Sequence, residues 1–219
     1  MSNSATDPTS TTDSSRSSPS EVASPVEVVA CGALAGHIRE IAARRGWPLV
    51  VRPLAAALHN RPETIKGHAE RTVAAARANG SRALLGYADC GSYGALDELA
   101  GRAGTPRLPG LHCYDLYAGP EAIAALFAAE PGSYLLTDYL VKTFDRTVIA
   151  SLGLDRHPEL WPDYFGHYRR LVWLAQHPTA ELEAEARRIA GLFGLPLRRL
   201  DTATTRLEAA LEVLLEEIS

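Results

Sequence analysis

Short apolar runs alternate with longer amphipathic stretches along most of this chain. The apolar runs predict strands at residues 26–31, 48–52, 82–87, 107–111, 133–136, 171–175 and 197–200. The stretches between them predict helices at residues 33–45, 62–79, 120–129, 179–193 and 204–218, with a short helix ending near residue 100. Alternation of this kind predicts an α/β fold, a Rossmann-like three-layer arrangement in which helices cover both faces of a parallel sheet.

Residues 1–25 do not follow this alternation. They contain nine serines and four threonines and almost no large apolar side chain. Such a segment cannot bury enough apolar surface to offset its ordering entropy, so we expect a disordered leader followed by a single domain over residues 26–219. The leader has no apolar core behind a basic start and does not resemble a secretory signal.

Charge and hydropathy exclude some classes of partner. The 22 Lys and Arg residues are scattered and the net charge is −4, which argues against a nucleic-acid partner. No apolar stretch approaches the roughly 20 residues that a membrane helix needs. Three cysteines, an odd number without a secretion signal, indicate reduced thiols in the cytoplasm rather than a disulfide framework.

The three cysteines lie where predicted strands end. Cys31 ends VEVVAC, Cys90 ends RALLGYADC and Cys113 ends RLPGLHC. Ligands of open α/β sheets collect at the carboxyl ends of the strands, and thiolates are the usual ligands of iron–sulfur clusters and zinc. Widely spaced single cysteines favour a cofactor held in a cleft, so we expect a 4Fe–4S cluster whose fourth iron is open to substrate.

Other interpretations of the cysteines remain open. Zinc is the alternative metal, since His59 and His112 offer further ligands. His112 and Cys113 are adjacent and point opposite ways in an extended chain, which favours Cys113 as the ligand. The cysteines also fit a role as small buried apolar residues, or one of them is a nucleophile that His59 activates.

Polar residues near the predicted strand ends are candidates for the rest of a site. His59, Asp89 and His157 are the candidate proton-transfer residues, although Asp89 also suits a helix cap and His59 a role in fixing its loop. Arginine suits anionic substrates. The candidate substrate-binding residues are Asn60, Arg61, Asp155 and Arg156. No Walker loop, GxGxxG, GxSxG or HExxH motif is present.

Several short motifs form a distinctive set. They are residues 30–34 (ACGAL), 58–63 (LHNRPE), 86–91 (GYADCG), 110–114 (GLHCY), 136–138 (LTD) and 153–160 (GLDRHPEL). Together they resemble a prokaryotic family known as domain of unknown function 1638. The resemblance spans residues 26–215, and the chain has Asp115 where we expect Glu.

The resemblance implies a link to corrinoid-dependent methyltransferases of the trimethylamine type, and hence a role in methyl-group or corrinoid metabolism. The chain itself lacks the DxHxxG signature that supplies a cobalt ligand. The leading hypothesis is a metal-dependent lyase or transferase that acts on a small polar metabolite at the three-cysteine centre. The alternative is a metal- or cofactor-binding accessory protein of a corrinoid methyltransferase system.

Overall fold

The computed structural model describes Met1 and residues 25–218, so the predicted leader lies almost entirely outside the described residues. The strands form two parallel three-stranded sheets. The first has the order β2-β1-β3, with β1 at Val26–Cys31, β2 at Leu49–Leu54 and β3 at Arg82–Gly86. The second has the order β4-β5-β6, with β4 at Ser133–Thr137, β5 at Arg170–Ala175 and β6 at Leu197–Asp201.

Helices connect these strands. The α-helices are α1 (Gly32–Arg45), α2 (Ile65–Ala78), α3 (Ala95–Ala103), α4 (Asp115–Ala118), α5 (Pro120–Ala129), α6 (Asp138–Phe144), α7 (Ala150–Leu152), α8 (Trp161–Phe165), α9 (Ala180–Phe193) and α10 (Thr205–Glu217). Short 3₁₀ turns lie at Ala56–Asn60 (η1), Pro62–Thr64 (η2) and Pro158–Leu160 (η4), and a π-helical turn, η3, spans Asp145–Ile149.

Local sequence explains where these helices begin and end. The Thr179 side chain accepts a hydrogen bond from the Leu182 amide and caps α9, which Gly194 closes in the left-handed conformation. Gly32 begins α1 immediately after β1, where a Cβ atom would lie 2.7 Å from the Leu54 carbonyl oxygen. Glycine at this position therefore allows the start of α1 to pack against the end of β2.

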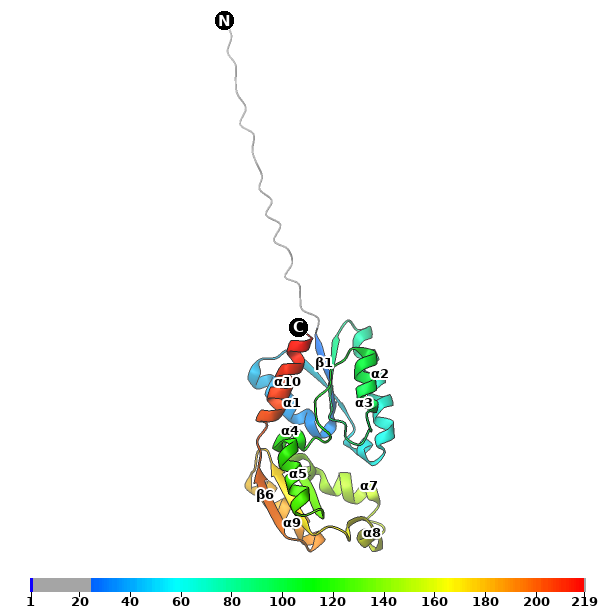
Figure 1. The fold of residues 1–219 in the computed structure, drawn as a ribbon, viewed down its shortest axis with the longest axis vertical. Coiled ribbons are helices and arrows are strands. Elements are labelled where there is room, and N and C mark those ends of the chain that lie inside the picture. Colours follow the sequence, from blue (N-terminus) through cyan, green and yellow to red (C-terminus); the bar gives the residue numbers. More distant parts are fainter. Residues whose placement is uncertain (2–24, 219) are drawn as a thin grey trace.

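The first sheet and its helices form what we call the first lobe. Helices α1 and α10 lie on one side of β1, and α2 and α3 lie on the other (Figure 1). The last helix, α10, returns from the second sheet and packs on α1 and α4. Glu208 on α10 pairs with both Arg44 and Arg45 at the end of α1, at 2.5 and 3.0 Å. The C-terminal helix thus belongs to the core of the first lobe.

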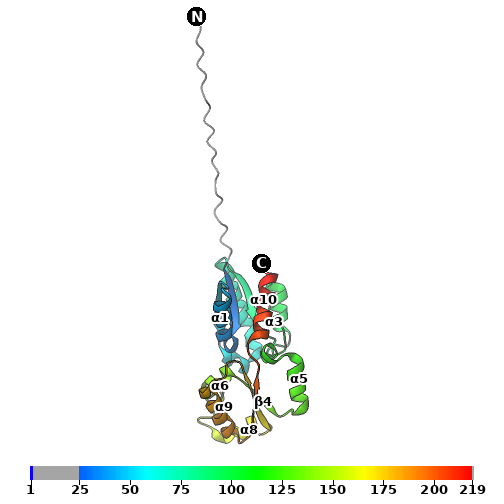
Figure 2. The same ribbon diagram turned by 90° about the vertical axis from the view of Figure 1, so that its left-hand side faces the viewer.

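The second sheet, with α5 to α9, forms the second lobe. Strand β5 is buried on both faces: Leu171 and Trp173 pack toward α6, α8 and α9, whereas Val172 and Leu174 pack against α5. Successive side chains of a strand point to opposite faces, so a continuous apolar run requires cover on both sides. Figure 2 shows α5 on the opposite side of this lobe from α6 and α9.

The carboxyl ends of the two sheets face each other. Ala33, just after β1, lines the same cavity as Asp138, just after β4, and His177, just after β5. The ends at which parallel sheets bind ligands therefore border one cleft between the lobes.

The parallel α/β class is confirmed, whereas the number of sheets differs from the prediction. We expected one sheet, but β4 pairs with β5 and the second sheet is separate. Residues 107–111 were expected to form a strand and make only a single bridge, from Arg107 to Leu85. Pro106 and Pro109 flank this bridge, and proline has no amide proton to extend a ladder.

None of the helices in the described part of the chain combines the length and the apolar character that a bilayer crossing requires.

Glu27 on β1 makes the first lobe sensitive to acid. Its carboxylate accepts hydrogen bonds from Arg52 at 2.6 Å and Ser81 at 3.1 Å. The hydrogen bond from Arg52 is the main cause that lowers the Glu27 pKa, and burial opposes it. Because the folded pKa lies below the usual 4.5, this stabilisation is complete above that pH and is lost as pH falls through the folded pKa.

We therefore predict that Glu27→Gln destabilises the protein most near neutral pH. The difference in free energy of unfolding between wild type and variant should shrink as pH falls from about 6 to about 3. Urea unfolding at several pH values measures this difference in free energy. The matched control is Glu121→Gln, at an exposed residue. A difference that does not change with pH would contradict the role assigned to this pair.

Candidate functional site

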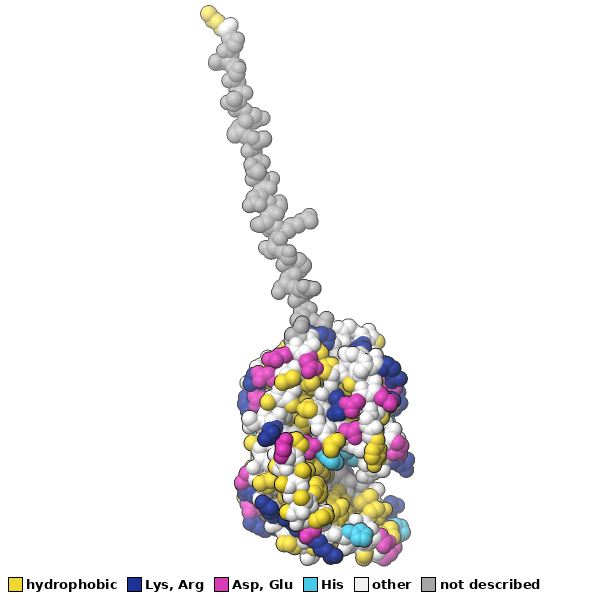
Figure 3. Space-filling model, viewed as in Figure 1, with side chains coloured by type: hydrophobic (Ala, Val, Ile, Leu, Met, Phe, Trp, Pro, Cys, Tyr) yellow, Lys and Arg dark blue, Asp and Glu magenta, His cyan; other side chains and the backbone are white. Residues whose placement is uncertain are grey.

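The cleft between the lobes contains two adjoining cavities. The larger, of about 450 Å³, is lined by α1, α6 and the segment after β5. The smaller, of about 200 Å³, is lined by η1, the segment around Cys113 and the start of α6. Ala33 and Tyr139 line both. Figure 3 shows the surface hollowed between the two lobes, with histidine at the edge of the hollow.

The fold brings the three cysteine segments to one place. Strands β1 and β3 are direct neighbours, with Ala30 opposite Gly86, so Cys31 and the segment leading to Cys90 leave the sheet side by side. The Cys90 amide then donates to the Leu111 carbonyl at 2.8 Å. This bond places the Cys90 loop beside the turn that leads to Cys113. The three segments that carry the cysteines are therefore neighbours, although their sulfurs do not all lie within 4.8 Å of one another.

The loop that carries Cys90 is strained and tightly held. Cys90 and Tyr93 both have a φ of 51°, a left-handed conformation that non-glycine residues rarely adopt. The Asp89 carboxylate accepts hydrogen bonds from the Ser92 hydroxyl and from the Tyr93 and Gly94 amides, at 2.8, 3.1 and 2.8 Å. Strain of this kind persists where the surroundings over-determine the backbone and is concentrated at functional sites.

The role of Asp89 follows from these bonds. Burial raises its pKa, but the hydrogen bonds from Gly94, Ser92 and Tyr93 more than offset this, and the pKa is lowered. Both carboxylate oxygens of Asp89 accept hydrogen bonds from its own loop. These hydrogen bonds favour a capping role for Asp89 over a role in proton transfer.

His59 lies in η1 next to the cysteines. Its Nδ1 is 2.9 Å from the Ala56 carbonyl oxygen, which can only accept, so Nδ1 carries the proton. The free Nε2 then faces the thiols, 3.9 Å from the Cys31 sulfur. Burial lowers the pKa of His59, but a hydrogen bond with Cys90 and the Cys90 charge raise it more, so that the pKa is raised overall.

Tyr87 has a buried hydroxyl without a partner. The side chain is fully buried and stacks on His59, with ring centroids 6.3 Å apart. Its hydroxyl makes no hydrogen bond. Burial is the main cause that raises its pKa, and the nearby charges of Cys31 and Cys90 add to it. An unpaired buried hydroxyl beside two thiols is costly unless a further group supplies the missing acceptor.

The thiols themselves lie in different surroundings. Cys31 is fully buried, and burial raises its pKa to about 11 although the Ala33 and Leu34 amides at the start of α1 lower it. Cys113 is partly buried and lines the smaller cavity. Its pKa is raised well above the usual value, mainly by burial and then by the charges of Cys90 and Cys31.

A second group of metal-type side chains borders the larger cavity. His37 and Glu40 on α1 and His177 after β5 place one ligand atom each within 4.8 Å of one another. Among the described residues this is the one group of three or more His, Cys, Asp or Glu that is so close, so the three cysteine sulfurs are spaced more widely. Burial, followed by the charge of His177, lowers the pKa of His37.

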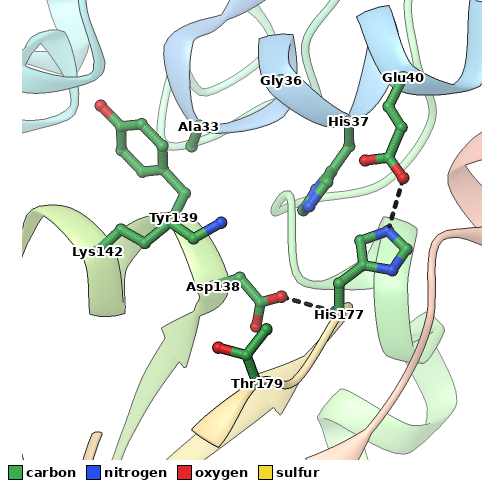
Figure 4. A pocket seen from close by; sticks show the side chains of 9 residues that line it. All are labelled: Ala33, Gly36, His37, Glu40, Asp138, Tyr139, Lys142, His177 and Thr179. Atoms are coloured by element: carbon green, nitrogen blue, oxygen red, sulfur yellow. Dashed lines mark hydrogen bonds and ion pairs between the residues drawn. The ribbon is translucent and has the colours of Figure 1, made fainter. Parts of the chain in front are cut away.

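Asp138 fixes the segment that carries His177. It is 1% exposed and accepts hydrogen bonds from the Trp173 indole at 2.9 Å and from the Gln176 and His177 amides at 3.2 and 2.6 Å. This carboxylate therefore joins the end of β4 to the end of β5 at the floor of the larger cavity (Figure 4).

Several predicted site residues lie away from both cavities. Asp155 and Arg156 are exposed and pair with each other at 3.8 Å, and exposed His157 pairs with Glu159. Arg61 is exposed and lines neither cavity.

Asn60 and His112 complete the predicted set. Asn60 lines the smaller cavity and donates to the Ser151 hydroxyl across the cleft at 3.2 Å. His112 is exposed and lines neither cavity.

A family model described as "Protein of unknown function (DUF1638)" matches residues 53–211. The chain belongs to the DUF1638 family. The match includes His59, Cys90 and Cys113, and it begins after the strand and helix that carry Cys31 and His37. No curated protein and no solved structure matches this DUF1638 chain.

Sequence reasoning missed the second group of this DUF1638 protein. His37 and Glu40 are three residues apart, a spacing that puts both on one helix face. His177 follows the predicted strand 171–175, at the type of position that drew attention to the cysteines. Both sequence features were visible. However, α1 and the segment after β5 belong to different lobes, and their contact depends on how the lobes face each other.

We predict that Asp138→Ala destabilises the protein by about 3 kcal/mol, because it leaves several buried N–H donors without an acceptor. Urea unfolding measures the loss, and exposed Asp163→Ala should change stability by no more than about 0.5 kcal/mol. Equal effects of the two substitutions would show that Asp138 does not join the strands as described.

Proposed function

We propose that this DUF1638 protein is an enzyme that holds an iron–sulfur cluster on Cys31, Cys90 and Cys113 and acts on a small polar metabolite in the cleft. The observation that carries the proposal is the convergence of three cysteine segments beside an open cavity. Cys31 and Cys90 follow adjacent strands, and the Cys90 loop is bonded to the turn before Cys113. Cys113 lines the cavity itself.

The spacing of the sulfurs favours a cluster over a single zinc ion. Thiolates on one tetrahedral zinc, with Zn–S bonds of about 2.3 Å, lie roughly 3.8 Å apart. Cysteine sulfurs around a 4Fe–4S cluster are further apart, within roughly 7 Å. The three sulfurs here do not all fall within 4.8 Å of one another. This spacing is wider than a single tetrahedral zinc ion requires.

The unpaired hydroxyl of Tyr87 supports the same conclusion. Buried polar groups nearly always have a partner, and this hydroxyl has none, although it is close enough for the charges of Cys31 and Cys90 to raise its pKa. A sulfur-rich group held by the cysteines would supply the acceptor. The residues therefore fit an iron–sulfur cluster in two ways. Three thiols from neighbouring segments can serve as ligands, and one buried hydroxyl can donate a hydrogen bond to the cluster.

The cluster would supply a Lewis-acidic iron, and the side chains of the protein would transfer protons. A 4Fe–4S cluster with three cysteine ligands supplies an iron that can act as a Lewis acid. The thiols must lose their protons when they become ligands, and the free Nε2 of His59 can accept one. His59 also lines the smaller cavity and can move a proton to or from a bound substrate.

The smaller cavity sets the class of substrate. Its volume of about 200 Å³ suits a small metabolite, and its lining mixes apolar Leu140 and Val148 with Tyr114, Tyr134 and Thr137. Such a lining orients a compact molecule with few polar groups. A lyase or transferase reaction, including one in methyl-group or corrinoid metabolism with a methyltransferase as partner, fits this cavity. Reduced cysteines and a cluster suit a reducing cytoplasm.

We predict that anaerobically purified protein contains iron and sulfide near four per chain and a broad visible absorbance that dithionite bleaches. Cys31→Ser, Cys90→Ser and Cys113→Ser should each lose most of the iron and the colour together, because each removes a ligand. Metal and sulfide analysis with visible spectroscopy measures this loss. Tyr93→Phe, at an exposed residue of the same loop, is the matched control and should retain both.

Other metal contents would overturn the proposal in distinct ways. About one zinc and no colour would assign a mononuclear site. Three titratable thiols and no metal, with only one cysteine sensitive to alkylation, would assign a cysteine nucleophile paired with His59. A stable cluster in all three serine variants would place the cluster elsewhere.

We predict that Tyr87→Phe keeps the cluster and makes its reduction potential more negative. Hydrogen bonds to cluster sulfur raise the potential, and this substitution removes one donor while leaving the buried ring in place. A redox titration followed by visible absorbance gives the potential, with Tyr93→Phe again as control. An unchanged potential at full iron content would show that the hydroxyl does not contact the cluster.

A further inference from the structure

The larger cavity contains a second cluster of ligand-type side chains that is distinct from the cysteines. His37 and Glu40 extend from α1 in the first lobe, and His177 follows β5 in the second. The Glu40 carboxylate lies 3.4 Å from the His177 Nε2, and the two imidazole centroids are 5.5 Å apart. Figure 4 shows the three side chains directed toward one another at the edge of the cavity.

Buried groups position both histidines. The Nδ1 atom of His37 lies 2.7 Å from the hydroxyl of Tyr117, which is 2% exposed, so this hydrogen bond leaves Nε2 as the free ligand atom. The His177 amide donates to the buried Asp138 carboxylate at 2.6 Å. Metal-binding histidines characteristically use their second ring nitrogen in a hydrogen bond, as His37 does toward Tyr117. The arrangement is therefore preorganised from outside the cluster.

An ordinary surface ion pair would explain the contact between Glu40 and His177 but not the position of His37. Glu40 and His177 are exposed and could pair as many surface residues do. Such a pair does not require His37, whose ring is half-buried and faces His177 edge to face. Two imidazoles and one carboxylate within 4.8 Å form a donor set that a divalent transition metal takes.

We propose that His37, Glu40 and His177 bind a divalent first-row transition metal ion between the two lobes. Ligand atoms about 2.1 Å from one ion lie roughly 3 to 4 Å apart, so small side-chain rotations close the present spacing. Three protein ligands leave coordination positions open toward the cavity of about 450 Å³.

The lining of the larger cavity indicates the ligand class. Lys142, Tyr139 and Thr179 line it beside the proposed ion. A cation next to an ammonium group favours a small anion with carboxylate oxygens. Because two ligands belong to the first lobe and one to the second, the ion also joins the lobes. This site does not depend on the cysteine centre.

Cobalt(II) is a suitable probe, since its spectrum reports the ligand type. Titration of the full-length protein should give weak visible d–d bands without the strong near-ultraviolet absorption of cobalt–thiolate bonds. His177→Ala and His37→Ala should each weaken this binding at least tenfold, and His68→Ala, at an exposed histidine on α2, should leave it unchanged. Saturating cobalt should also raise the Tm of wild type but not of His177→Ala.

The outcomes separate this site from the cysteine centre. Cobalt binding that persists in Cys113→Ser and is lost in His177→Ala supports the proposal whatever metal the cysteines hold. Binding that survives in both histidine variants, or that shows only thiolate absorption, would overturn it. Circular dichroism shows whether each variant is folded, and Glu40→Gln, which keeps the shape of the side chain, should weaken binding even if an alanine variant unfolds.

Discussion

The fold depends on one constraint: two parallel sheets direct their carboxyl ends into the same cleft. In each sheet all strands run the same way, so the residues that follow them emerge at one edge. Ala33, just after β1, and Asp138, just after β4, therefore come from different sheets yet line the same cavity. The return of α10 to the first lobe, through Glu208 and the end of α1, ties the second sheet back to the first. The chemistry-bearing residues gather because these edges meet.

Most of the fold could be predicted from the sequence, since short apolar runs and helix caps are local signals. Strand β1 ends at Cys31 as expected, and α9 begins after Thr179. The division into two sheets was not predictable, because an apolar run such as β4 does not specify its neighbour. The single bridge at Arg107 shows how prolines limit a pattern that otherwise indicates a strand.

The candidate site was predictable only in part, for the same reason. Cys31 ends β1 and Cys90 follows β3, so a rule about parallel sheets could group these two in advance, whereas Cys113 follows only the bridge at Arg107. His177 also follows the end of a strand. Its contact with Glu40 depends on how the two lobes face each other, and local sequence patterns do not reveal the distance between residues of different lobes. The polar segment that contains Arg156 was predicted to bind substrate but lies exposed, away from both cavities. A surface turn can have the same composition as a binding loop.

The two candidate centres share structural support around α1. Cys31 ends the strand that leads into this helix, and His37 lies on its cavity side. Tyr117 bonds to His37, and the charges of Cys113 and Cys31 add to the burial that raises its pKa. The cleft is best described as one region with a sulfur-rich side and a nitrogen- and oxygen-rich side.

The most direct test of the central claim is anomalous X-ray diffraction from crystals of anaerobically purified protein, recorded on either side of the iron and zinc edges. We expect a compact iron peak enclosed by the sulfurs of Cys31, Cys90 and Cys113. A zinc peak bonded to these sulfurs, or three free thiols with no metal among them, would contradict it.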